Sequence, residues 1–144
     1  MRLRNYTNID DALIRRMIAF AKPSNVAGFD VELKNFGRDG VRGRAYPYGC
    51  GYRSRGCPLV VVAIQRANRH LKACKNRGAY LPRPPMTREE AVLKVLAHEL
   101  RHLWQAKVKK GRRVWGARGQ YSERDADAYA LRALRHWRRG EPMP

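Results

Sequence analysis

The chain has 144 residues, of which 31 are Lys or Arg and 12 are Asp or Glu, so its formal net charge at pH 7 is +19. We expect one domain over residues 1–144, and a hydrophobic content of 44% excludes a disordered basic tail. No apolar run has membrane-spanning length, so no membrane segment is expected. The charge predicts a polyanionic partner, either DNA or RNA, with an acidic protein or an anionic assembly surface as the alternative.

The cysteines and the N-terminal residues predict a cellular setting. The chain has three Cys, and its N-terminus lacks the apolar run of a signal peptide, so we expect an intracellular, cytoplasmic protein. Cys50 and Cys57, followed by His70 and Cys74, leave a second metal site open. The spacing of the first two Cys is wider than in an ordinary zinc knuckle, which favours isolated thiols.

The first half of the chain alternates between helical and extended patterns. Residues 9–22 carry apolar side chains at helical spacing, and Pro23 ends that predicted helix. Alternation predicts a half-buried strand over residues 29–34, and a glycine-rich turn precedes a second predicted strand at 41–46. The apolar run at 58–64 predicts a strand that is buried on both faces.

A connecting region follows these strands. Residues 65–77 are predicted to form a short basic helix, and Pro82, Pro84 and Pro85 a stiff connector. Together the segments predict an α+β fold in which an N-terminal helix and a small, about three-stranded sheet precede two further helices.

The next helix carries an HExxH motif. Thr87 and Glu90 form a capping box at its start, and its apolar arc is wide enough to predict burial. His98 and His102 are four residues apart and therefore share one face, so both imidazoles can bind one metal ion. Glu99 can then take a proton from water at that metal.

A second helix supplies a candidate third ligand. Glu123 follows His102 after 20 intervening residues, and Asp127 lies one turn beyond it on the same face. Glu123 can complete the ligand set, and Asp127 can accept the second N–H of a metal-bound His. The alternative is that these acids only favour the start of the helix. Ser122 is a candidate N-cap, and Gly140 a candidate C-terminal stop.

These motifs resemble a family group. HExxH followed some 20 residues later by a Glu-containing helix resembles the gluzincin branch of zinc metallopeptidases. The stretch Glu123-x-Asp125-Ala126-Asp127-x-Tyr129-Ala130 is similar to the ExEAxxFA-like pattern of ImmA/IrrE-type peptidases, and SprT-like zincins are similar in size and layout. The resemblance covers residues 87–134.

The resemblance implies a small zincin-like domain with an HExxH active-site helix and a C-terminal ligand helix. It implies zinc as the cofactor, with His98, His102 and Glu123 as ligands and Glu99 as the catalytic residue. Two departures are visible. Asp125 replaces the usual Glu of the pattern, and the third His of SprT-like enzymes has no counterpart before His136.

Two functions remain open. The first is a zinc metallopeptidase that acts on a protein or peptide substrate, including proteins associated with nucleic acid. Glu99 would be its general base, and Tyr121 and Tyr129 are the candidates for an electrophilic helper. The second is a non-catalytic nucleic-acid- or assembly-binding protein that keeps a zincin fold and a structural zinc.

The basic segment that begins at Lys107 and contains Trp115 predicts where a polyanion would bind. Basic residues interleaved with Trp suit phosphate contacts and base stacking, although a solvated loop would show the same composition. The segment Arg42–Arg55 is a second such stretch, or an ordinary hairpin. The candidate contacts in the first segment are Lys107, Lys109, Lys110, Arg112, Arg113, Trp115 and Arg118.

Overall fold

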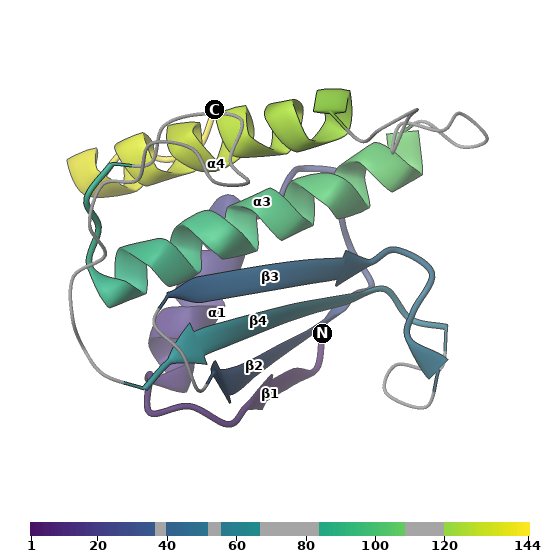
Figure 1. The fold of residues 1–144 in the computed structure, drawn as a ribbon. Helices are drawn as coiled ribbons and strands as arrows, with labels where there is room; N and C mark the ends of the chain where they lie inside the picture. Colours follow the sequence, from purple (N-terminus) through teal and green to yellow (C-terminus); the bar gives the residue numbers. More distant parts are fainter. Residues whose placement is uncertain (37–39, 52–55, 67–83, 109–119) are drawn as a thin grey trace.

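A computed structural model of the chain describes residues 1–36, 40–51, 56–66, 84–108 and 120–144 (Figure 1). Within these residues the chain forms three helices and a four-stranded sheet, so the predicted α+β class is confirmed. The strands all precede the second and third helices in the chain. None of the helices in the described part is long and apolar enough to cross a membrane.

The sheet has the strand order β1-β2-β4-β3. β2 (Asp30–Phe36) pairs in parallel with β1 (Leu3–Asn5) on one side and with β4 (Leu59–Gln65) on the other. β3 (Val41–Tyr46) pairs with β4 in the antiparallel direction and forms an edge of the sheet. The expectation of about three strands was wrong by one, because the three residues of β1 are too few to show an alternating pattern.

Strand β4 is the centre of the sheet. All seven of its residues are buried, which confirms the prediction for the apolar run. Val60, Val62 and Ile64 belong to the hydrophobic core, and the residues between them face the other side of the sheet.

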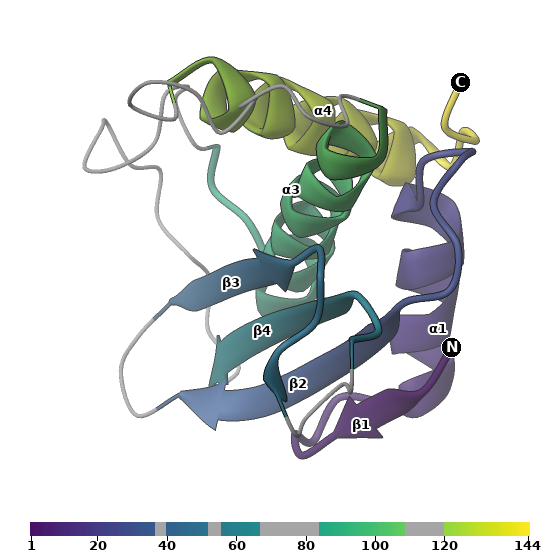
Figure 2. The same cartoon turned by 90° about the vertical axis from the view of Figure 1, so that its right-hand side faces the viewer.

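The helices form two layers over one face of the sheet (Figure 2). α1 (Asp11–Ala21) and α3 (Arg88–Val108) contact each other, and α3 also contacts β3 and β4. α4 (Gln120–Arg139) packs along α3, on the side away from the sheet. α3 is therefore enclosed by the sheet, α1 and α4, and this enclosure explains why its apolar arc is so wide.

The helix ends follow the predicted capping residues in part. The Asp10 side chain accepts a hydrogen bond from the Leu13 amide at the start of α1, and the Thr87 hydroxyl accepts one from the Glu90 amide, 3.1 Å away, at the start of α3. Glu90 was expected to reach back toward Thr87, but its carboxylate pairs with Arg138 of α4.

The last helix begins earlier than expected and ends where expected. α4 starts at Gln120, so Ser122 lies inside the helix and the prediction that it caps the first turn was wrong. Gly140 has a φ of 67° and ends the helix, as predicted. The Gly140 and Glu141 amides donate to the Trp137 and His136 carbonyls, which is the Schellman arrangement. The predicted helix at 65–77 lies almost wholly outside the described residues, and its first residue, Gln65, belongs to β4. Of the predicted connector, Pro82 lies outside the described residues, whereas Pro84 and Pro85 are described and lie in no helix or strand.

Candidate metal centre

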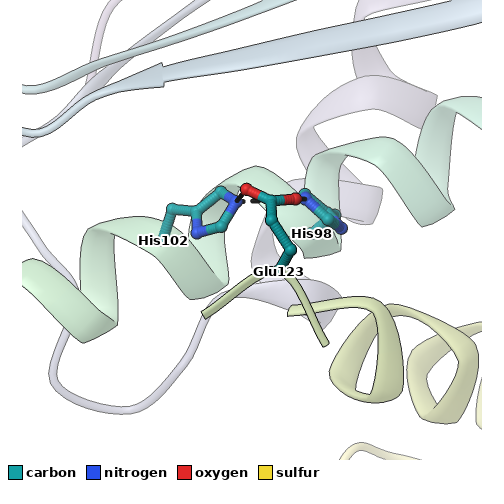
Figure 3. Close-up of side chains that lie close together, drawn as sticks. All are labelled: His98, His102 and Glu123. Carbon is teal, nitrogen blue, oxygen red and sulfur yellow. Dashed lines mark hydrogen bonds and ion pairs between the residues drawn. The ribbon is translucent and has the colours of Figure 1, made fainter. Parts of the chain in front are cut away.

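Three side chains from two helices converge where α4 crosses α3 (Figure 3). His98 and His102 project from one face of α3, because four residues make about one helical turn. Their Nε2 atoms are 3.0 Å apart. Glu123 of α4 points between them, with Oε2 3.1 Å from His98 Nε2 and Oε1 3.1 Å from His102 Nε2.

These three groups can hold one metal ion. One ligand atom from each residue lies within 4.8 Å of the other two. Among the residues that the structure describes, no other cluster of His, Cys, Asp and Glu meets that condition. The predicted spacing between the HExxH helix and Glu123 therefore corresponds to a real convergence of side chains.

Asp127 lies behind His98. Its Oδ1 atom is 2.9 Å from His98 Nδ1, so the carboxylate accepts the N–H on the ring nitrogen that faces away from the metal position. This is the contact that the spacing of Glu123 and Asp127 predicts. It fixes the ring orientation and leaves Nε2 for the ion.

His102 has a different support, which the sequence did not reveal. His102 Nδ1 is 2.9 Å from Gln105 Oε1, and the Gln105 amide nitrogen donates to Asp125 Oδ2 over 2.8 Å. Arg101 holds the same carboxylate through two hydrogen bonds of 2.7 and 3.1 Å. Because the Asp125 carboxylate can only accept hydrogen bonds, the nitrogen of the Gln105 amide faces Asp125 and its oxygen faces His102. The oxygen accepts a hydrogen bond, so the proton of His102 lies on Nδ1.

The charges at the centre are strongly coupled. Burial alone would lower the pKa of His98, but hydrogen bonds to Asp127 and Glu123 and the charge of Glu99 outweigh it and raise that pKa to about 9. The imidazoles of His102 and His98 hold the pKa of the Glu123 carboxyl group well below its usual range. Without metal, the site is therefore a protonated imidazole beside an ionised carboxylate.

Glu99 is buried beside these ligands, with 7% of its surface exposed. Burial raises the pKa of its carboxyl group, although the imidazoles and a hydrogen bond from the Ala45 backbone oppose the shift. Strand β3 makes room for it at Gly43. A Cβ atom at that position would lie 2.6 Å from Glu99 Cγ and 2.5 Å from Val95 Cγ1. Neither Gly43 nor Ala45 was singled out by sequence, because only the pairing of β3 places them there.

Other predicted site residues lie elsewhere. The Tyr129 hydroxyl donates to the Ala21 carbonyl over 2.8 Å, so it ties α4 to the end of α1. Lys107 is exposed near the end of α3 and donates to the Asn25 carbonyl. Cys50 and Cys57 are half-buried and do not form a disulfide in the described part of the chain. The remaining candidates lie outside the described residues or have side chains outside them: Tyr121, Lys109, Lys110, Arg112, Arg113, Trp115, Arg118, His70 and Cys74.

Comparison of the chain with protein-family models, with curated proteins and with solved structures found no match. The assignment of this centre therefore depends on its own geometry and chemistry.

The residues behind the two imidazoles should set metal affinity. Replacing such a partner of a ligand weakens binding on the order of 10- to 100-fold, so we expect that loss for Asp127→Ala and for Gln105→Leu. Asp127→Asn keeps an acceptor oxygen and should recover most of the affinity. A competitive chelator titration measures the effect.

Glu141→Ala is the matched control for this titration, because the Glu141 carboxylate pairs with His136, 3.4 Å away, beyond the other end of α4. It should bind metal like the wild type. Unchanged affinity in Asp127→Ala and Gln105→Leu would show that neither residue positions a ligand.

Metal affinity should rise with pH. Below a pKa of about 9, His98 carries a proton that the metal must displace, so the apparent affinity should increase about tenfold per pH unit between roughly pH 6.5 and 8. The stability of the metal-free protein should change in the opposite direction. The His98 ion pairs stabilise fully below the unfolded pKa of about 6.5, and this stabilisation is lost as the pH rises toward about 9.

Isothermal titration in buffers of different ionisation enthalpy counts the proton released on metal binding, and chemical denaturation follows the stability of the metal-free protein. A pH-independent metal affinity with no proton release would contradict a protonated His98.

Proposed function

We propose that the chain is a zinc-dependent metallopeptidase with a zincin-like layout, in which Glu99 is the general base. The observation that carries the proposal is a buried carboxyl group immediately beside three converging metal ligands. The resemblance to gluzincins over residues 87–134 points to the same assignment.

The donor set fits zinc. Two imidazoles and one carboxylate are a ligand set of catalytic zinc sites, and three protein ligands leave a fourth position open. Ligand atoms about 2.0–2.1 Å from a tetrahedral ion are about 3.3 Å apart. The three contacts at 3.0–3.1 Å between His98, His102 and Glu123 come close to that spacing and need to open only slightly. Zinc there would supply Lewis acidity that acidifies water and polarises a carbonyl.

Glu99 suits proton transfer. Burial raises the pKa of its carboxyl group above that of an exposed Glu, which is the direction that favours uptake of a proton by this group. In peptide hydrolysis, Glu99 would take the proton of the attacking water and pass it to the leaving amine. A purely structural metal site needs ligands but no buried carboxyl group beside them, and Glu99 therefore favours the enzyme over the non-catalytic alternative.

The surroundings of Glu99 suit an extended peptide. β3 is an edge strand, and its Arg42–Arg44 stretch is exposed next to the catalytic carboxyl group. A peptide can add to such an edge through backbone hydrogen bonds. A cavity of about 220 Å³ lies further along, between Pro47 and Tyr48 after β3 and Leu103 and Ala106 on α3. Its apolar walls suit an apolar substrate side chain about one helical turn beyond His102.

The ligand assignment can be tested by metal content. We expect about one zinc per chain in the wild type and a loss of most of it in His98→Ala, His102→Ala and Glu123→Ala, because two ligands cannot close the site. Elemental analysis after dialysis against a weak chelator measures it. His136→Ala is the control, since His136 lies near the C-terminal end of α4. Full zinc in the first two variants would contradict the assignment.

The catalytic assignment can be tested with Glu99→Gln. The amide cannot accept the proton of the water, so cleavage should fall by about 100- to 10,000-fold while zinc content and thermal unfolding stay close to wild type. A peptide library of mixed sequence, read by mass spectrometry, measures cleavage whichever side chains the enzyme prefers. Zinc-loaded wild-type protein that cleaves no peptide would contradict the peptidase, and an equally fast variant would remove Glu99 as the base.

A further inference from the structure

The sheet has a second face that none of the described helices covers. Gly43 of β3 faces α3, since a Cβ atom there would touch Val95 and Glu99. Arg42 and Arg44 therefore point to the opposite side of the sheet, because successive residues of a strand alternate. α1, α3 and α4 all lie on the α3 side (Figure 2). We call the opposite side the outer face; it carries Arg4, Asp30, Glu32, Lys34, Phe36, Arg42, Arg44 and Tyr46, with the buried Leu59, Val61, Ala63 and Gln65 of β4 between them.

The accessible charge at the Phe36 end of the outer face is positive. Lys34, Arg42 and Arg44 are exposed there. Glu32 lies across β4 from Arg44, is 3% exposed and lies 4.0 Å from Arg4. Asp30, at the other end of β2, is half-buried and accepts a hydrogen bond from the Arg2 amide. A ligand that approaches the Phe36 end therefore meets three exposed cations, and an anion is the chemistry that complements them.

Two of these cations lie against aromatic rings. The Arg42 guanidinium is 5.2 Å from the centre of the Phe36 ring, and the Arg44 guanidinium is 5.2 Å from that of Tyr46. Arg42 reaches Phe36 across β4, since β4 separates β3 from β2. The face thus combines fixed charges with planar groups on which a flat ring can stack.

We propose that the outer face binds single-stranded nucleic acid. Lys34, Arg42 and Arg44 contact phosphates, and Phe36 and Tyr46 with the guanidinium planes over them stack on bases. Positive charge alone would bind any polyanion. The aromatic rings favour nucleic acid, because every base can stack on them, whereas the carboxylates of an acidic peptide cannot. The site is separate from the metal centre, because Gly43 faces α3 and its two Arg neighbours face away, so one ligand can occupy each side of β3.

Salt-dependent binding tests the location. A fluorescent thymidine oligonucleotide is titrated by anisotropy at several salt concentrations with the wild type, with Arg42→Gln/Arg44→Gln, and with Arg135→Gln/Arg139→Gln. The last pair is exposed on α4 and removes the same charge. Each lost phosphate contact should reduce the slope of log K against log salt by about 0.7, so the Arg42/Arg44 variant should lose about 1.4 and the α4 variant almost nothing. Equal losses in both would overturn the proposed surface.

The nature of the partner is tested with matched polymers. An abasic oligonucleotide of equal charge should bind on the order of tenfold more weakly than the thymidine oligonucleotide, because it offers no base to stack. Tyr46→Ser should remove part of that difference while leaving the salt slope unchanged. If polyglutamate of equal charge binds as tightly as the thymidine oligonucleotide, the face binds acidic proteins and the nucleic-acid proposal is wrong.

Discussion

The docking of α4 on α3 depends on ionisable groups that face one another inside the protein. His102 and Glu99 are 4% and 7% exposed, and an unpaired charge at such a position is strongly unfavourable. α4 supplies the groups that match the imidazoles, since Glu123 and Asp127 contact them and Asp125 holds Gln105. Glu99 is matched instead by the imidazoles and by a hydrogen bond from the Ala45 backbone of β3. Packing of α4 on α3 therefore brings the three candidate ligands together, and a bound ion would add its binding free energy to that packing.

The sequence predicted the helices, strands and side-chain positions that depend only on residues close together in the chain. Apolar runs and spacing located α1, β2, β3, β4 and α3 to within about two residues, and helical geometry alone placed His98 and His102 on one face. The position of Glu123 beside the two imidazoles and the contact of Asp127 with His98 needed only the assumption that the two helices meet.

What the sequence could not predict depends on pairing between distant segments. The orientation of the Gln105 amide against His102 is set by Asp125 of another helix, α4, which accepts from that amide and is itself held by Arg101 of α3. The sequence of β3 does not predict the strand order, in which β3 lies antiparallel at the edge of the sheet. The surroundings of Glu99 at Gly43 and Ala45 follow from that order, so no motif search around HExxH would have found them.

Adjacent residues of strand β3 are under different structural constraints. Gly43 has no positive φ and needs no special backbone conformation, yet a single added methyl group would collide with both Val95 and Glu99. Arg42 and Arg44 on either side are exposed and sterically free. A mutational scan of this strand would therefore show alternating tolerance, in which position 43 rejects larger side chains by volume while positions 42 and 44 have room for them and are sensitive to loss of the guanidinium group.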